Sequence, residues 1–321
     1  MFGNTLTVGS GSKGKLEVVD SQVGITGSAD VGLDGFGDVD VTGGGVLIGG
    51  DLSIGVLANG IVTTRKGSFL KAQNISVGST GDPLGAANGG SLVTGNDCEV
   101  TARDSVSIGE FLAFGIATVK NRGELASPII RVGPLGTLLL EPLSNVTGGV
   151  ILNGVGRIVP ASAEDKQESG PAVIDGNLTL GPEGMLIIEV DDPSMPALEV
   201  LGATTLSGEL IVEIPTDTVL TANQELQLVK FTGGVTGAFS SVTFPVAPEG
   251  FVGTTEVVDG VVRLTVVDPG VPSGGEGEGE GEGEGEGEGE GEGCAASPTA
   301  PHPSVPYADV AALLLAAAFL L

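Results

Sequence analysis

Two cysteines and one histidine are the residues of this chain best suited to nucleophilic chemistry. Cys98 lies in the body of the sequence, whereas Cys294 and His302 stand near its end. A cysteine or serine nucleophile needs a nearby base, most often an imidazole, and zinc needs a set of Cys and His ligands. The body offers no imidazole. We therefore expect no catalytic residue, metal or cofactor there, and we interpret Cys98 as a small buried side chain.

Cys294 stands at the junction of two unusual segments. Before it, residues 275–293 alternate glycine and glutamate; after it come Ala295, a Pro-rich stretch and an uncharged apolar run, residues 310–321. Small residues, a polar spacer and an apolar run are the arrangement found in signals that are cleaved or exchanged for a lipid anchor. We predict processing or attachment at Gly293, Cys294 and Ala295 by a sorting protease or other envelope machinery.

The apolar run, residues 310–321, is short. As a helix of about 12 residues it would measure about 18 Å, against about 30 Å for the hydrocarbon core of a bilayer. We expect a short apolar helix that contacts a membrane transiently or as part of an anchor. The residues expected to make this contact are Val310, Leu313, Leu314, Leu315, Phe319 and Leu320.

The acidic spacer and Pro-rich segment, residues 269–309, are expected to be disordered. The Gly-Glu alternation has no apolar side chain whose burial could offset the entropy lost on ordering. Repulsion between its carboxylates keeps such a chain extended, and about 19 residues reach up to about 60 Å. A solvated spacer is the favoured interpretation, and a calcium-collecting tail is the alternative.

The charge balance restricts the partners. The chain has 13 Lys and Arg against 41 Asp and Glu, a formal net charge of −28. Such a chain repels phosphate backbones, so we expect no nucleic-acid partner. An anionic membrane surface is disfavoured for the same reason.

Two motifs imitate ligand sites. Residues 9–14 match GxGxxG, but a dinucleotide site needs a helix directly after it, and the following KLEVV is a strand pattern. Asp38 and Asp40 begin like a calcium loop, but Gly49 stands where the bidentate glutamate is required. The alternation DVDV indicates a strand with outward carboxylates, which leaves weak calcium binding along acidic edges open.

The elements that position these residues come from an internal repeat. An apolar residue, a polar residue, Val or Ile and then Gly recur, with Gly at 9, 32, 55, 78, 109 and 133. The first four of these glycines are each 23 residues apart, and the next two steps are 31 and 24. A period in the low twenties with short strands is typical of a β-solenoid. We predict six or seven coils in residues 1–159, with these glycines at corners of positive φ and a loop at residues 81–90.

A second all-β module is predicted to follow. Residues 160–170 are polar and aperiodic and are interpreted as a linker, whereas residues 171–268 show strand pairs separated by Gly turns. Asp259-Gly260 is a two-residue hairpin turn. The predicted fold is thus all-β, a parallel β-helix-like solenoid and a second all-β module that covers its open end. The disordered linker and the short apolar helix follow.

An enzyme that degrades polysaccharides is the alternative to a non-catalytic protein. Its acids could come from Asp191-Asp192 or Glu164-Asp165. It also needs a sugar-binding cleft, usually lined by aromatic side chains, and the body has no Trp or Tyr. We expect its phenylalanines, Phe36, Phe69, Phe111 and Phe114, to stack in the core.

The run VTGGGVLIGGDLSIG, residues 41–55, resembles the repeats of autotransporter-type passenger proteins. The strand pairs of residues 176–267 resemble the module that closes such passengers. The tail resembles bacterial C-terminal sorting signals of the PEP-CTERM and GlyGly-CTERM kind, in the variants with a Cys after glycines. Those signals end in basic residues after the apolar run. In this chain the apolar run ends at Leu321 without them. The resemblance covers most of residues 1–268 and implies architecture better than function.

The sequence therefore predicts a secreted bacterial cell-surface protein of structural or adhesin-like type, without catalytic activity. Its ligand would be a surface glycan or protein, bound through a solenoid face or the loop at residues 81–90. The alternatives are the polysaccharide-degrading enzyme and a glycan-binding module. The first residues, MFGNTLTVG, show no basic segment followed by an apolar run, so we expect the export signal to be missing from the chain as given.

Overall fold

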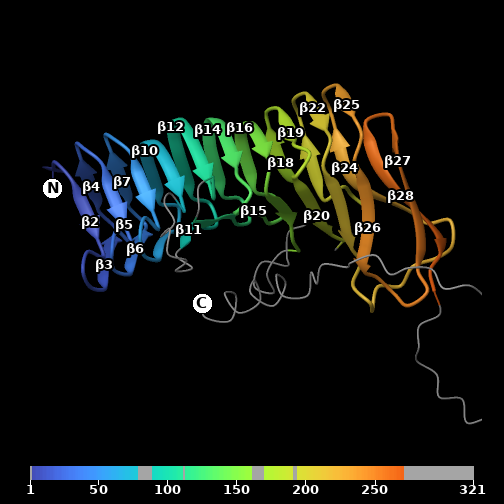
Figure 1. Ribbon diagram of the computed structural model, residues 1–321, viewed down its shortest axis with the longest axis horizontal. Helices are drawn as coiled ribbons and strands as arrows, with labels where there is room; N and C mark the ends of the chain where they lie inside the picture. Colours follow the sequence, from blue (N-terminus) through green and yellow to red (C-terminus); the bar gives the residue numbers. More distant parts are fainter. Residues whose placement is uncertain (1, 79–88, 111–112, 161–169, 191–193, 271–321) are drawn as a thin grey trace, which may run out of the picture. The chain divides into compact units, whose positions relative to one another are not determined.

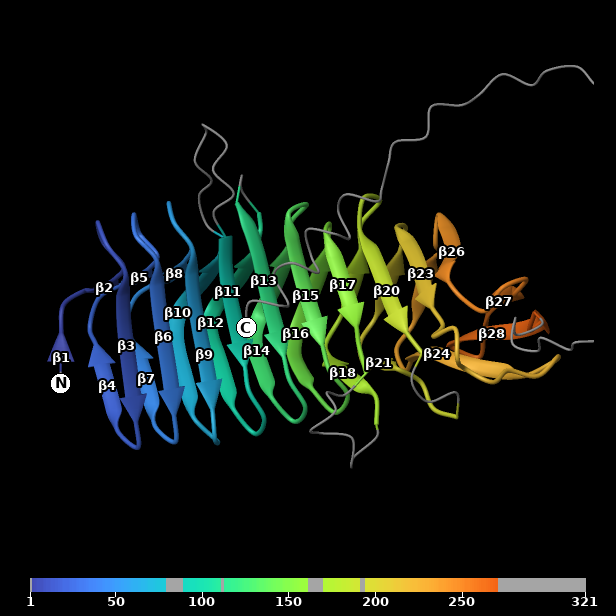
Figure 2. The same cartoon turned by 90° about the horizontal axis from the view of Figure 1, so that it is seen from below.

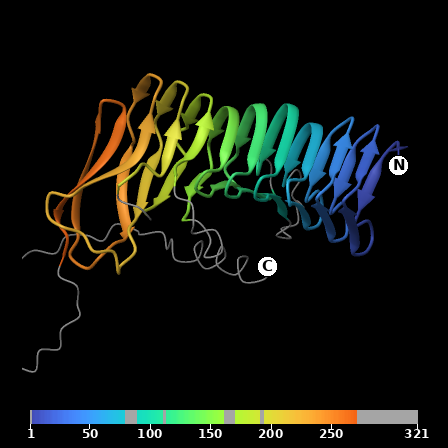
Figure 3. The same cartoon turned by 180° about the vertical axis from the view of Figure 1, so that it is seen from behind.

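The computed structural model describes residues 2–78, 89–110, 113–160, 170–190 and 194–270. Every regular element in these ranges is a β-strand, and the strands follow one another along the stack in chain order (Figures 1 and 3). Nearly all of them pair in parallel, so the all-β, parallel β-helix-like fold predicted from the repeat is confirmed.

Ten parallel strands form the sheet that we call sheet B, which lies in one layer in Figure 2. In spatial order its strands are β3 (Gly14–Val19), β6 (Gly37–Thr42), β9 (Gly60–Arg65), β11 (Gly89–Thr94), β13 (Phe114–Val119), β15 (Gly136–Leu140), β17 (Val155–Ile158), β20 (Met185–Glu189), β23 (Glu209–Glu213) and β26 (Ser241–Val246).

The 18-stranded sheet, sheet A, contains two parallel rows. The first row holds β1 (Phe2–Gly3), β4 (Gln22–Ile25), β7 (Gly45–Ile48), β10 (Phe69–Val77), β12 (Glu99–Ile108), β14 (Glu124–Val132), β16 (Asn145–Leu152), β18 (Ala172–Asp175), β21 (Leu198–Val200) and β24 (Glu225–Phe231). The second row holds β2 (Leu6–Val8), β5 (Ala29–Val31), β8 (Leu52–Ile54), the second halves of β10, β12, β14 and β16, and then β19 (Leu178–Leu180), β22 (Thr204–Leu206) and β25 (Val235–Gly237). Each coil therefore contributes one segment to each of three stacks.

The register between coils reproduces the period of the sequence. Gly14 pairs with Gly37, and Gly37 pairs with Gly60, steps of 23 residues. The longer step appears between β9 and β11, where Gly60 pairs with Gly90. β11 keeps the register of β9 although the step is longer.

Alternation along each strand creates the core. In the second row of sheet A, the inward residues of successive coils are directly paired and almost completely buried; they include Val31, Ile54, Val77, Ile108 and Val132. Full burial of such a side chain contributes about 1.5–3 kcal/mol. One cluster of buried apolar residues extends from Val8 to Val266, so neighbouring coils share a single core.

The predicted corner glycines are confirmed at five positions and wrong at the sixth. Gly9, Gly32, Gly55, Gly78 and Gly109 have φ values between 60° and 82°. Gly133 is not among the residues of positive φ. Proline at position 134 disfavours helical conformations in the residue before it, and the connection closes through a hydrogen bond from Gly136 N to Gly133 O. This corner is shorter and does not need a left-handed residue.

A second set of glycines is required by close approach rather than by φ. Gly60 begins β9, and a Cβ atom there would collide with the carbonyl oxygen of Val31 and the amide of Gly55. The equivalent residues of neighbouring strands, Gly37 and Gly90, pair directly with it. These glycines let the corner loop fold tightly against the start of β6, β9 and β11.

The parallel stack is the same on both sides of the range predicted as a linker. β16 pairs with both β18 and β19, and β17 pairs with β20, so the strands on either side of residues 161–169 belong to the same sheets. The arrangement changes at β27 (Val252–Val258) and β28 (Val261–Asp268), which form an antiparallel hairpin. The predicted hairpin turn is confirmed, with φ of 51° at Asp259 and 76° at Gly260. β28 pairs with β24 and so covers the free edge of that strand.

We expect Gly60→Ala to lower the free energy of unfolding by about 1–3 kcal/mol, the range for overpacking a close contact. Gly234→Ala is the matched control, because a Cβ atom there has no neighbour within 4 Å, and its effect should stay within about 0.5 kcal/mol. Urea unfolding followed by circular dichroism measures both. Equal midpoints for the two variants would show that the glycine contact does not limit the fold.

Candidate functional site

The processing and membrane residues predicted from the sequence lie outside the described residues. These are Gly293, Cys294, Ala295, Val310, Leu313, Leu314, Leu315, Phe319 and Leu320, together with His302. The carboxylate pairs considered for an enzyme, Glu164-Asp165 and Asp191-Asp192, also lie outside them. All these assignments stay predictions.

The two motifs that resemble ligand sites lie where the repeat predicts a corner and a strand. The glycines of residues 9–14 lead directly into strand β3. Asp38 and Asp40 lie at outward positions of β6, as the DVDV alternation predicted. Within the described ranges, no group of three or more His, Cys, Asp or Glu side chains is placed to hold a metal ion. Cys98 is 2% exposed, which confirms its prediction as a buried side chain.

Ion pairs connect neighbouring coils on the outer face of the first row of sheet A. Lys71 Nζ lies 2.8 Å from Glu99 Oε1, on the strand next to its own. Thr101 also donates a hydrogen bond to Glu99. These two hydrogen bonds, first that from Lys71 and then that from Thr101, hold the pKa of Glu99 below its usual value. The pair is half-exposed, which is the setting of a structural surface bridge.

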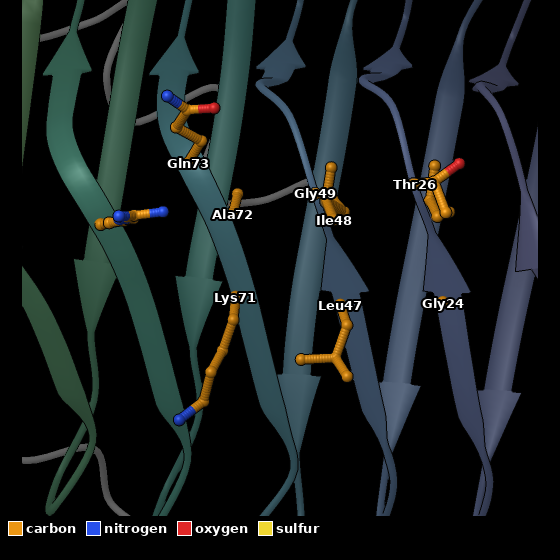
Figure 4. A pocket seen from close by; sticks show the side chains of 10 residues that line it. Gly24, Thr26, Leu47, Ile48, Gly49, Lys71, Ala72 and Gln73 are labelled. Atoms are coloured by element: carbon orange, nitrogen blue, oxygen red, sulfur yellow. The ribbon is translucent and has the colours of Figure 1, made fainter.

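An open groove of about 470 Å³ crosses this face where the first row of sheet A bends. Leu47 and Lys71 lie side by side on adjacent strands, with Gln73 beyond the bend and Gly49 and Ala72 between them (Figure 4). Arg103 also lines the groove. The guanidinium of Arg103 is exposed and forms no salt bridge with any described residue. The groove thus combines an apolar side chain, an amide and two cations in a molecule of strongly negative net charge.

The outer face of sheet B has a different character. Its outward residues form two columns that cross the strands. From β9 to β20 the first column reads Ile61, Ser91, Ile116, Thr137, Val155 and Met185. From β9 to β23 the second column reads Thr63, Val93, Thr118, Leu139, Arg157, Ile187 and Ile211. We call these thirteen residues the uncharged face, because Arg157 is the single charged member.

Arg157 is neutralised within the sheet itself. Its Nη2 lies 2.6 Å from Glu213 Oε2 and 3.5 Å from Glu189 Oε2, both on neighbouring strands of sheet B. Other charged residues lie only beyond the ends of the columns, at Asp38 and Asp40 on β6 and at Glu209 on β23. The middle of the face therefore carries hydroxyl and aliphatic side chains without an unpaired charge.

Exposed apolar side chains border this face just before or at the start of three sheet B strands, β9, β13 and β15. Leu57 is 48% exposed, Phe114 47% and Leu135 37%. The prediction that the phenylalanines stack in the core is wrong for Phe114, because this residue begins β13 at an outward position. Phe36 and Phe69 are half-buried and do not belong to the core cluster, so the prediction is wrong for them too. Phe69 begins β10 at an outward position, with Lys71 Nζ 5.8 Å from its ring centre. Phe111 lies outside the described residues.

No protein-family model, curated protein or solved structure matches this chain. The resemblance to autotransporter passengers and to sorting signals therefore stays a prediction. In the described part of the chain there is no helix of the length and hydropathy needed to span a membrane.

We expect Glu99→Gln to lower stability at neutral pH by a few tenths of a kcal/mol, the usual contribution of an exposed pair. The lowered pKa of Glu99 means that its contribution is present above its unfolded pKa and is lost as the pH falls through the folded pKa. The difference between wild type and variant should therefore disappear in acid. Glu124→Gln is the control, because Glu124 accepts a hydrogen bond from Thr147 and has no basic partner among the described residues. A difference that persists in acid would contradict the assignment.

Proposed function

We propose that this protein is a non-catalytic surface scaffold, secreted by a bacterium and displayed through the processing region around Cys294. The observation that supports this best is the continuous parallel stack with one shared core, from β1 to β26. Such a stack holds its ends apart rigidly, because each coil is fixed by its neighbours. The Gly-Glu alternation of residues 275–293 would hold this stack away from the cell envelope.

The side-chain chemistry of the outer faces also favours a scaffold. The ion pairs described above join adjacent coils and lie at the surface, as Lys71 with Glu99 and Lys230 with Glu199 do. Carboxylates used for acid–base catalysis usually sit where burial or a second carboxylate changes their pKa. Near the groove, the pKa of Glu99 is lowered. Its main cause is the hydrogen bond from Lys71, and not burial or a second carboxylate.

A glycan-binding module is the second candidate, and the groove of sheet A favours it. Leu47 offers an apolar surface for one face of a sugar ring, and Arg103 offers hydrogen-bond donors. Lys71 is already paired with Glu99, and Gln73 Nε2 already donates to Asp104. Arg103 is therefore the cation through which the groove would select a polymer with carboxylate groups. The occupant that matches this chemistry is an acidic polysaccharide.

Surface display is tested by intact mass analysis of the protein from the envelope and soluble fractions of producing cells. We expect a mature end near Cys294 in the envelope fraction, and we expect Cys294→Ala to abolish this species. Cys98→Ala is the control, because it removes the other thiol, which is buried. A full-length chain in the soluble cytoplasmic fraction would overturn the proposal.

Glycan binding is tested by titrating the protein with a polyuronate and with a neutral glucan. We expect saturable binding of the polyuronate, weakened by Arg103→Ala about tenfold, the loss of roughly one charge-assisted contact. Arg131→Ala is the control, because Arg131 is an exposed arginine on the second row of sheet A. Equal binding by both variants would exclude the groove, and cleavage of the polymer would favour the enzyme instead.

A further inference from the structure

Asp–Pro peptide bonds are the covalent links of this chain that acid cuts most readily. The side-chain carboxylate of aspartate can attack the carbonyl carbon of its own residue, and the proline nitrogen, once protonated, leaves as a secondary amine. The chain has such bonds at Asp82-Pro83, Asp192-Pro193 and Asp268-Pro269. The first two lie outside the described residues. The third follows the last residue of β28, so the structure describes its surroundings.

The carboxylate of Asp268 is held beside the bond that it would cut. Gly270 N donates a hydrogen bond to Asp268 Oδ1 at 3.0 Å. The ring closed by this hydrogen bond contains the Asp268–Pro269 peptide bond, because the donor comes two residues after the acceptor. Proline also fixes its own φ. Few rotations therefore remain that could carry the carboxylate away from its own carbonyl carbon, and such positioning lowers the barrier to reaction.

The donor of this hydrogen bond is fixed by the fold. Gly270 has a φ of 75°, a conformation that glycine adopts without steric cost. A Cβ atom at this position would collide with Glu249 O, so Gly270 packs directly against the turn between β26 and β27. This turn is itself closed by a hydrogen bond from Phe251 N to Pro248 O. The N–H group of Gly270 is thus kept in place beside Asp268.

The second carboxylate oxygen of Asp268 is available as the nucleophile. The side chain is exposed, and Oδ2 has no hydrogen-bond or ion-pair partner among the described residues. Water and hydronium ions can therefore reach both the carboxylate and the proline nitrogen.

The charged groups around Asp268 favour protonation of the leaving nitrogen. The elements packed against it carry Glu249 in the turn, Glu256 on β27 and Glu225 on β24. The basic group of this region, Arg263 on β28, is paired with Glu225. The surroundings are negative as a whole, and negative surroundings attract hydronium ions.

The bond lies where the folded body ends. β28 is the last strand of the described residues (Figure 1), and the sequence after it leads to the Gly-Glu alternation of residues 275–293 and to Cys294. The strand pairings of β28 all involve residues up to Asp268. A cut after Asp268 would therefore leave every one of these pairings intact and would separate the body from the spacer.

We propose that the Asp268–Pro269 bond is a self-cleavage site that releases the folded body from the acidic spacer in mild acid. Asp268 Oδ2 bonds to the carbonyl carbon of Asp268, the bond from this carbon to Pro269 N breaks, and a hydronium ion gives its proton to that nitrogen. Water then opens the resulting cyclic anhydride and restores the carboxylate. One water molecule is consumed, and nothing is oxidised or reduced. The products are a body that ends at Asp268 and a spacer that begins with the secondary amine of Pro269.

The test is intact mass analysis of the full chain after incubation at neutral pH and at about pH 4, where carboxylic acids of peptides are partly ionised. We expect residues 1–268 and 269–321 as separate products in acid and an intact chain at neutral pH. The bonds after Asp82 and Asp192 are internal references, and we expect each to be cut at least about tenfold more slowly, because positioning accelerates the cut after Asp268. Equal rates at the three bonds would show only the ordinary lability of this dipeptide and would overturn the proposal. A chain that stays intact in acid would overturn it too.

Variants separate the chemistry from the fold. Asp268→Asn removes the nucleophile and Gly270→Ala displaces the hydrogen-bond donor, so each should slow this cleavage at least about tenfold and leave the reference bonds unchanged. Asp192→Asn and Gly234→Ala are the matched controls and should be cut after Asp268 as the wild type is. Circular dichroism verifies that each variant is folded. Unchanged cleavage after position 268 in either of the first two variants would overturn the proposal.

Self-cleavage and surface display can fail separately. The cleavage depends on residues 268–270 and not on Cys294. Cys294→Ala should therefore leave its rate unchanged, although the same substitution is expected to abolish the processed species of the envelope fraction.

Discussion

A single coil of this protein cannot bury its apolar side chains, because each coil has only three short strand segments around them. Burial is achieved by the coils above and below, whose backbones pair in register through both sheets. This ladder imposes one spacing on everything that projects from it. Inward residues become continuous rows such as Ile54, Val77 and Ile108, and outward residues become columns of equal pitch.

The glycine positions follow from the same constraint. A ladder in exact register requires each corner to return the chain to the same place in every coil. Gly55 does this with a left-handed conformation, and Gly60 does it by leaving room for the backbone of the corner. Where the connection shortens before β15, proline and a tight turn replace the left-handed glycine. The register of the strands is preserved although the corner differs.

The columns also explain why the outer faces differ in chemistry. On the first row of sheet A, residues one strand apart include Lys71 and Glu99, which pair. On sheet B the equivalent neighbours are aliphatic and hydroxyl residues, so the same geometry produces a surface suited to packing. The second row of sheet A carries Ser53, Ser76 and Ser107 in one outward column. One ladder therefore presents three surfaces with different side-chain chemistry.

The sequence by itself determined the fold class, the inward rows, most corner glycines and the turn at Asp259-Gly260, because these depend on a local period and on φ preferences within a few residues. The character of the residues around Cys294 is likewise local, and their role remains a prediction. Tertiary structure alone decided that the strands before and after residues 161–169 belong to the same sheets, that Phe114 is exposed, and that Ser91 lies between Ile61 and Ile116. The physical reason is that neighbours in a column are separated by 18 to 30 residues, including irregular segments. Only backbone pairing between coils brings such residues to one place, and so only the folded ladder reveals the groove and the uncharged face.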